Sequence, residues 1–184
     1  MPGDVEDQLH MEGGKRRIDR VLSPAFIENL ADLSLAEVKR RRDEALAERE
    51  YLSLLRRLVQ GRFDILRAER AHRTGGEEGP LVDRLPETLA DETPAASRGE
   101  VIRVAVPDNE IAMARRRIEQ LMADVTISDP ASLSEEEMAR AEQRLGDEER
   151  VVSEARAAVI AVHDTLQGEL KRRYKDDLSQ ITAP

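Results

Sequence analysis

The sequence contains no cysteine and no tryptophan, and aromatic residues make up only 2% of it. Without cysteine the chain can form no disulfide, offers no thiolate nucleophile and cannot hold a metal through cysteine. The scarcity of aromatic residues argues against a β-sandwich or barrel, whose strands favour aromatic and β-branched side chains. We therefore predict a hydrophobic core of leucine, valine, isoleucine and alanine arranged along helices.

Long apolar runs are also missing. No stretch approaches the roughly 18 to 20 apolar residues of a membrane-spanning helix, and no apolar signal-peptide region follows the N-terminus. We expect no membrane association and a cytoplasmic location.

The charge of the chain is negative overall but unevenly distributed. A net charge of −9 argues against a general nucleic-acid binder, so we expect no direct DNA binding. Residues 37–73 nevertheless carry eleven basic and seven acidic side chains. A locally basic helix fits a specific anion or an acidic partner, although a solvated face of ion pairs would also explain it.

Two segments show the seven-residue spacing of a coiled-coil seam. Each begins at a Ser-x-x-Glu capping box, Ser34 to Glu37 and Ser134 to Glu137, in which the side chains satisfy free backbone N–H groups. These patterns predict helices over about 34–73 and 134–177. The seam positions are Val38, Ala45, Leu52, Val59 and Leu66 in the first helix, and Met138, Leu145, Val152, Val159 and Leu166 in the second.

The predicted fold is all-α, with the two long helices paired as a hairpin. Periodicity allows parallel or antiparallel pairing, because the connection is long enough for both. We predict a single helical domain over 17–178, with a short helix at 24–31 that starts after Ser23 and a connector at 74–133 that contains a further helix near 109–124. Residues 1–16 are expected to form a disordered tail, and residues 179–184 a tail after the domain.

One polar pattern occurs twice in the same helical register. Its positions, separated by steps of three and four residues, are Arg49, Ser53, Arg56, Gln60 and Asp64 in the first copy and Glu149, Ser153, Arg156, Ile160 and Asp164 in the second. Such steps keep side chains on one stripe of a helix. A duplicated stripe can form a site with approximate two-fold symmetry, which suits a symmetric anionic ligand.

The residue types suit a phosphate that carries a purine. Arginine offers a planar fork of donors for phosphate oxygens or for the O6/N7 edge of guanine. A carboxylate can accept hydrogen bonds from the guanine N1–H and amino group, and serine and glutamine add neutral hydrogen bonds. A surface of ion pairs remains the plainer interpretation of the same residues.

The spacing Glu-x3-Ser-x2-Arg-x3-Gln-x3-Asp, together with segments 17–22, 54–69 and 85–87, resembles the signature of the actinobacterial RsiG family. Members of that family are anti-sigma factors that use cyclic di-GMP to hold the sporulation sigma factor WhiG. The resemblance, which runs from about residue 17 to 177, implies an antiparallel coiled coil that binds an intercalated cyclic di-GMP dimer. It also implies repression of WhiG-dependent transcription until the nucleotide falls.

The resemblance assigns roles to individual residues. Arg56 and Arg156 would contact phosphate and guanine, and Asp64 and Asp164 would accept from guanine. Ser53, Ser153, Gln60 and Glu149 would complete the ligand shell.

Two positions depart from this signature. Arg49 replaces the first glutamate, although Glu48 and Glu50 flank it, and Ile160 replaces the second glutamine. Each copy thus keeps four of five positions. Loss of one neutral hydrogen bond should weaken binding by about 1 kcal/mol. Arg49, Glu50 and Ile160 are therefore secondary candidates.

Other function classes find less support. The three histidines, His10, His72 and His163, are scattered, and no nucleophile motif or glycine-rich phosphate loop is present, so we expect neither enzyme activity nor a metal site. Phe63 is expected to pack and not to stack on a base. A ligand-free coiled-coil adaptor would explain the seams but not the repeated polar pattern. A homodimer would have twice the mass of 20.7 kDa, whereas we expect a monomer before sigma binds.

Overall fold

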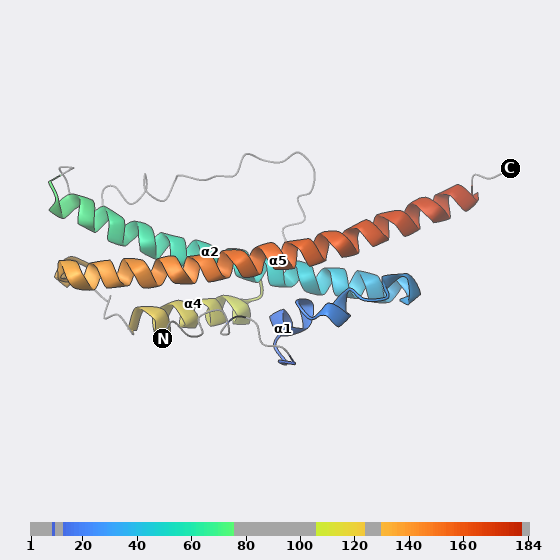
Figure 1. Ribbon diagram of the computed structural model, residues 1–184, viewed down its shortest axis with the longest axis horizontal. Helices are drawn as coiled ribbons and strands as arrows, with labels where there is room; N and C mark the ends of the chain where they lie inside the picture. Colours follow the sequence, from blue (N-terminus) through green and yellow to red (C-terminus); the bar gives the residue numbers. More distant parts are fainter. Residues whose placement is uncertain (1–8, 10–12, 76–105, 124–129, 182–184) are drawn as a thin grey trace. The chain divides into compact units, whose positions relative to one another are not determined.

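The computed structural model describes residue 9 and residues 13–75, 106–123 and 130–181. Within these residues every regular element is helical, and the expected all-α class is confirmed. The α-helices are α1 (Arg17–Val21), α2 (Leu35–Arg73), α4 (Asp108–Ala123) and α5 (Glu135–Ile181) (Figure 1). Short 3-10 helices occupy Pro24–Phe26, Leu30–Asp32 and Pro130–Ser132.

The chain divides into two compact units. The first unit consists of Met1–Ser53 and Val151–Pro184, and the second unit is Leu54–Arg150. Both long helices contribute to each unit, so each unit has its own pairing of α2 with α5.

In the first unit, the two helices are antiparallel. Arg42 Nη1 donates to Gln167 Oε1 at 3.3 Å, whereas Ser53, further along α2, meets the earlier Arg156 of α5 at 2.9 Å. The core between them consists of fully buried seam residues, namely Val38, Ala45, Leu52, Val152, Val159 and Leu166. Burying such side chains contributes about 1.5–3 kcal/mol each for the larger ones, which makes the seam the main stabilising feature of this unit.

The N-terminal elements cover this same unit. Ile18 and Val21 of α1 are buried, and Arg20 of α1 pairs with Glu44 of α2. Phe26 is also buried, and Arg41 Nη1 donates to its carbonyl at 2.7 Å. These contacts fix the entry of the chain into α2.

The position of the short N-terminal helix was wrongly predicted. Instead of one helix at 24–31, the structure has α1 at Arg17–Val21 and two 3-10 helices at Pro24–Phe26 and Leu30–Asp32. Asn29 interrupts the predicted segment because its backbone is left-handed, with φ at 51°. Asparagine adopts this conformation more readily than most residues, and a continuous α-helix cannot contain it.

In the second unit, the antiparallel pairing continues along α2 and α5. Arg56 pairs with Glu149 at 2.8 Å, and Arg70, further along α2, pairs with the earlier Glu142 at 2.8 Å. The buried seam residues here are Leu55, Val59, Leu66, Met138 and Leu145. The antiparallel hairpin that the resemblance implied is therefore confirmed.

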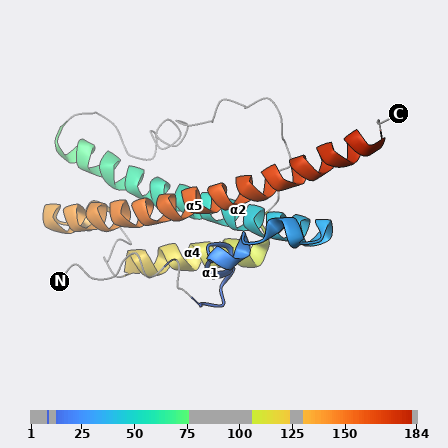
Figure 2. The same cartoon turned by 45° about the vertical axis from the view of Figure 1, so that its right-hand side comes forward.

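Helix α4 belongs to the second unit. Figures 1 and 2 both show it alongside the part of α5 that lies in this unit. Ala114 and Ile118 are its buried residues, and Arg117 Nε contacts Glu148 Oε1 at 2.7 Å. The expected helix near 109–124 is thus present, while the rest of the predicted connector, including 81–105, lies outside the described residues.

The predicted capping box at Ser134 is complete, whereas only the serine half of the box at Ser34 forms, because the Glu37 carboxylate pairs with Arg40 and Arg41. The Ser34 hydroxyl accepts from the Glu37 N–H at 3.2 Å, and the Ser134 hydroxyl accepts from the Glu137 N–H at 3.3 Å. The Ser134 N–H donates back to the Glu137 carboxylate at 2.8 Å, and this hydrogen bond, together with one from the Ser134 hydroxyl, lowers the pKa of Glu137. Local sequence therefore sets where α2 and α5 begin.

Candidate functional site

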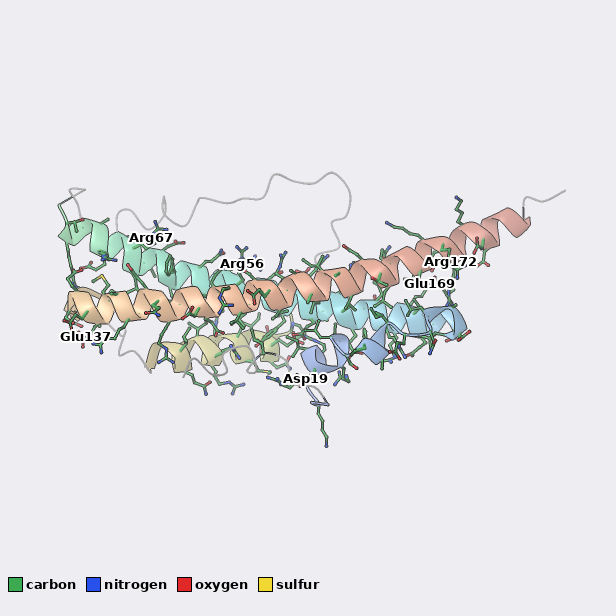
Figure 3. The ribbon with its side chains drawn as sticks, in the orientation of Figure 1. Asp19, Arg56, Arg67, Glu137, Glu169 and Arg172 are labelled. Atoms are coloured by element: carbon green, nitrogen blue, oxygen red, sulfur yellow. The ribbon has the colours of Figure 1, made fainter. Side chains whose placement is uncertain are left out.

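The first group of motif residues lies in the second unit. Arg56, labelled in Figure 3, donates from Nε to Glu149 Oε1 at 2.8 Å, and Gln60 Nε2 donates to the same oxygen at 3.5 Å. Asp64 follows one turn further along α2, and no hydrogen bond or ion pair joins it to another described residue. We refer to Arg56, Gln60, Asp64 and Glu149 as the second-unit cluster.

The second-unit cluster is accessible to solvent. The side chains of Arg56 and Glu149 are 36% and 30% exposed, and Gln60 and Asp64 are half-buried. An exposed ion pair of this kind contributes only about 0–1 kcal/mol to stability. A phosphate could therefore replace Glu149 as the acceptor of Arg56 at small cost, because the charge-assisted bonds to it are at least as strong.

The second group of motif residues lies in the first unit. Arg156 Nε donates to Ser53 Oγ at 2.9 Å, and Ser53 Oγ in turn donates to the Arg49 carbonyl at 2.7 Å. The Arg49 guanidinium pairs with Glu50 at 2.8 Å. We refer to Arg49, Ser53, Ser153, Arg156, Ile160 and Asp164 as the first-unit cluster.

The carboxylate of the first-unit cluster is well exposed. The Asp164 side chain is 70% exposed and lies 3.2 Å from Nδ1 of His163. Ser153, Arg156 and Ile160 are half-buried on the same helix, α5. This cluster therefore also presents a guanidinium, hydroxyls and a carboxylate to solvent.

The two clusters are chemically unequal. Antiparallel pairing places the first position of one copy with the arginine of the other copy, as Glu149 with Arg56. The equivalent position for Arg156 is residue 49, which is arginine, and Arg156 donates to the Ser53 hydroxyl. Ile160 belongs to this same cluster. Both departures from the signature thus fall in the first-unit cluster, whereas the second-unit cluster keeps its glutamate, arginine, glutamine and aspartate.

Sequence reasoning could not find this inequality. Counted along the chain, each copy retains four of five positions, so the two copies match the signature equally well. Because the helices are antiparallel, each cluster takes its residues from both copies. Only the pairing of α2 with α5 assigns Arg49 and Ile160 to the same cluster.

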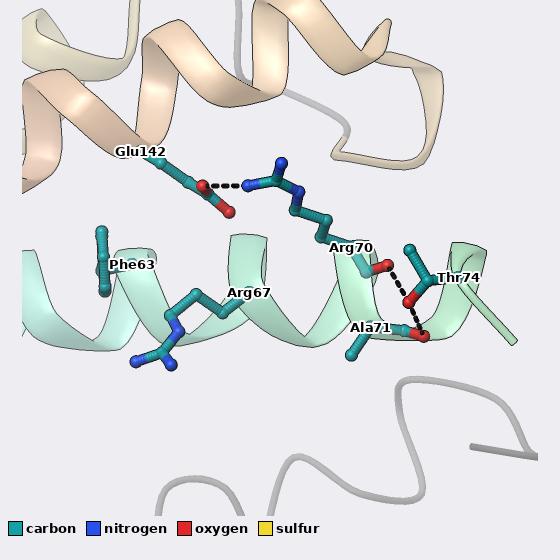
Figure 4. Close-up of a pocket in the computed structure, with 6 residues that line it drawn as sticks. All are labelled: Phe63, Arg67, Arg70, Ala71, Thr74 and Glu142. Carbon is teal, nitrogen blue, oxygen red and sulfur yellow. Dashed lines mark hydrogen bonds and ion pairs between the residues drawn. The ribbon is translucent and has the colours of Figure 1, made fainter. Parts of the chain in front are cut away.

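The polar stripe continues beyond the predicted motif as a groove. In the second unit, a groove of about 310 Å³ is lined by Phe63, Arg67, Arg70, Ala71, Thr74 and Glu142 (Figure 4). The Arg67 guanidinium lies 5.7 Å from the centroid of the Phe63 ring, and Arg70 pairs with Glu142 at 2.8 Å. Phe63 is half-buried and lines this groove.

The missed residues share the spacing of the motif. Phe63 follows Gln60 by three positions and Arg67 follows Asp64 by three, so both extend the same face of α2. Figure 3 shows Arg56 and Arg67 on α2. An aromatic ring beside a planar guanidinium offers a surface on which a base can stack.

No group of three or more histidine, cysteine, aspartate or glutamate side chains within the described part of the chain is arranged to hold a metal ion. In the same residues, no helix is long and apolar enough to cross a membrane.

Comparison with known families gives one match. The family of RsiG-like proteins matches residues 24–89, and no curated protein matches the chain. The matched stretch contains all of α2 and therefore the whole first copy of the motif, and it ends before α4 and α5. The resemblance is thus confirmed over residues 24–89, and at the level of the family it supports an anti-sigma factor of the RsiG type.

Proposed function

We propose, from the RsiG-like match over residues 24–89, that the chain is a cyclic di-GMP-dependent anti-sigma factor. In this proposal nucleotide binds to the duplicated motif, and the bound form sequesters a WhiG-type sigma factor. When the nucleotide falls, sigma is released and its genes are transcribed. The chain acts in the cytoplasm by binding alone, and no bond is made or broken.

The observation that carries this proposal is the meeting of motif side chains from two helices. Within the second unit Arg56 of α2 contacts Glu149 of α5, and within the first unit Arg156 of α5 contacts Ser53 of α2. If these residues were only ordinary surface charges, contacts between motif positions of the two helices would not be expected in both units. Clusters that each draw on α2 and α5 are what a ligand needs if it is to hold the two helices together.

The residues of each cluster fit a guanine nucleotide. Arg56 and Arg156 supply planar donors for phosphate oxygens or the guanine O6/N7 edge. Asp64 and Asp164 supply exposed or half-buried carboxylates that can accept from guanine N–H groups. The ligand itself supplies two negative phosphates and two guanines, in keeping with the duplication.

The inequality of the clusters bears on stoichiometry. The second-unit cluster has the full set of glutamate, arginine, glutamine and aspartate, so it should hold nucleotide more tightly than the first-unit cluster. Binding of two nucleotides per chain would then occur in two steps of different affinity. Arg49 in the first-unit cluster adds a positive charge that favours phosphate but cannot accept from guanine.

Nucleotide and sigma binding would be linked. If sigma binds the nucleotide-loaded chain more tightly, the nucleotide must bind the sigma complex more tightly by the same factor. Sigma would therefore lower the concentration of cyclic di-GMP that is needed to occupy the chain, without any catalytic step.

Isothermal titration with cyclic di-GMP, first on the chain alone and then on its mixture with the cognate WhiG-type sigma factor, tests the proposal. We expect up to two nucleotides per chain, in unequal steps, with tighter binding when sigma is present. Absence of heat in both titrations, with no nucleotide-dependent complex, would contradict the proposal.

A pair of charge reversals separates the proposal from its rival, a ligand-free coiled-coil adaptor. Arg56→Asp with Arg156→Asp should abolish both nucleotide and sigma binding, whereas an adaptor would keep its partner. The matched control is Arg116→Asp with Lys171→Asp, which makes the same change in charge at exposed positions outside the clusters. Circular dichroism of both double variants would show whether the helices persist.

A further inference from the structure

A second groove in the second unit lies between α2 and α4. It has a volume of about 340 Å³ and is lined by Arg57, Leu58, Gly61, Arg62, Ile65, Arg115, Ile118 and Glu119. None of these residues belongs to either motif cluster. The groove therefore needs an explanation of its own.

The lining combines an apolar floor with a basic rim. Leu58 and Ile65 are half-buried and Ile118 is buried, so aliphatic side chains form the floor. Three arginines and one glutamate accompany them. An interhelical groove with an aliphatic floor is the kind of surface that receives the apolar face of an amphipathic helix.

Two of the three arginines at the rim have no partner in the described part of the chain. Arg62 and Arg115 are exposed, and no ion pair or hydrogen bond joins either of them to another residue of the described part. Their neighbour Arg117, by contrast, binds Glu148 of α5 at 2.7 Å. The cationic rim on a protein of net charge −9 is thus a local feature that favours an acidic partner.

Gly61 is one of the residues that line the groove. Glycine is a poorer helix former than alanine, so its position within α2 is unfavourable for the helix itself. It contributes no side chain to the groove, so a larger residue at this position offers a test of docking.

We infer that the α2–α4 groove docks an acidic amphipathic helix of a protein partner, which, resting on the proposed function, is a helix of the sigma factor. Its apolar side chains would contact Leu58, Ile65 and Ile118, and its carboxylates would pair with Arg62 and Arg115. This surface is separate from the motif clusters. Nucleotide binding and sigma docking would thus use different residues of the second unit.

The test compares neighbouring arginines in the full chain saturated with cyclic di-GMP. Affinity for the WhiG-type sigma factor is measured by titration for Arg115→Glu, Arg62→Glu and the matched control Arg116→Glu. Arg116 is exposed on the same helix but does not line the groove. We expect about a tenfold loss for Arg115→Glu and Arg62→Glu and less than twofold for Arg116→Glu.

Gly61→Leu gives a second measure that does not depend on charge. Leucine is a better helix former than glycine, so the variant should melt no lower than the wild type while its side chain fills the groove. We expect weakened sigma binding with unchanged cyclic di-GMP binding to the isolated chain.

The outcomes separate the two proposals. If sigma binds the groove variants as tightly as the wild type, the groove inference is overturned and the proposed function stands. If the wild-type chain binds neither nucleotide nor sigma, the proposed function fails and the groove inference falls with it.

Discussion

At the scale of single residues, the partner of an arginine decides what it can do. Arg117 is held by Glu148 and fastens α4, whereas Arg115 two positions earlier lines an open groove. Arg56 and Arg156 occupy equivalent motif positions; Arg56 donates to the Glu149 carboxylate, and Arg156 donates to the Ser53 hydroxyl. The first position of the opposite copy is glutamate for Arg56 and arginine for Arg156.

Restoring the missing amide should strengthen the weaker cluster. We expect Ile160→Gln to tighten the second, weaker step of cyclic di-GMP binding about fivefold, since one neutral hydrogen bond contributes about 1 kcal/mol. Isothermal titration measures both steps. Ala158→Gln, at an exposed position outside the motif stripe, is the control and should leave both steps unchanged.

At the scale of elements, the buried seam and the helix ends account for the hairpin. The seam residues of α2 and α5 are almost completely buried in their units, so each methylene group removed from them leaves a cavity. Near the helix ends, both short-range ion pairs and contacts between distant parts of the chain contribute. At the C-terminal part of α5, Glu169 pairs with Arg172 and Arg173, and Arg173 donates to the Leu33 carbonyl at 2.7 Å.

Truncation of the seam should destabilise the protein strongly. We expect Leu52→Ala to lower the free energy of unfolding by about 2–5 kcal/mol, because Leu52 is fully buried. Urea unfolding followed by circular dichroism measures this change. Leu54→Ala, two residues away and half-buried, should cost clearly less, and equal losses for the two variants would contradict the assigned seam.

Stability in acid should depend on Glu169. Hydrogen bonds from Arg172 and Arg173 lower the pKa of Glu169 from 4.5 to about 2. Because the folded-state pKa is depressed, its stabilisation is present above pH 4.5 and is lost as the pH falls from there toward about 2. The melting temperature of Glu169→Gln should therefore fall less than that of the wild type between pH 4.5 and pH 2.5.

The same comparison needs a variant that removes a carboxylate elsewhere on α5. Glu136→Gln, at an exposed position in the first turn, should keep the acid dependence of the wild type. If Glu169→Gln and the wild type lose stability in parallel between these pH values, the pairing of Glu169 does not contribute to stability.

At the scale of the whole molecule, the question is how ligand, partner and fold are linked. A ligand that binds only the folded chain raises its stability by about 2.7 kcal/mol at a concentration one hundred times its Kd. Each cluster draws on both α2 and α5, so nucleotide binding should oppose separation of the two helices. By the same linkage, the nucleotide-loaded chain would bind the sigma factor more tightly than the free chain does.

Cyclic di-GMP should therefore raise the melting temperature of the wild-type chain by several degrees. The double variant Arg56→Asp with Arg156→Asp should show no such shift, which differential scanning calorimetry with and without nucleotide can measure. A nucleotide-induced shift of equal size in this variant would place the ligand elsewhere on the chain.

The chain alone should be a monomer. Both motif helices are present in one chain and pair with each other within each unit, so no second copy is needed to complete a cluster. Sedimentation equilibrium should give a mass near 20.7 kDa without nucleotide. A mass of twice this value would support dimerisation through the motif helices instead.

The sequence by itself determined the helical class, the starts of the long helices and the seam. These features depend on short-range or periodic signals: the Ser-x-x-Glu boxes, the heptads and the near absence of aromatic residues. The three-to-four spacing of the motif likewise follows from helical geometry alone. The failed prediction at 24–31 also has a local cause, because nothing in the pattern showed that Asn29 would be left-handed.

Only the tertiary structure decided which residues from distant parts of the chain come together. Heptads fit parallel and antiparallel pairing equally, and the orientation decides that Glu149 meets Arg56 and that Arg49 and Ile160 share one cluster. The packing of α4 could not be predicted from the sequence either, since a short amphipathic helix does not specify which face of the α2–α5 pair it packs against. Periodicity along one helix carries no information about its neighbour, and the inequality of the clusters and the α2–α4 groove both arise from that pairing.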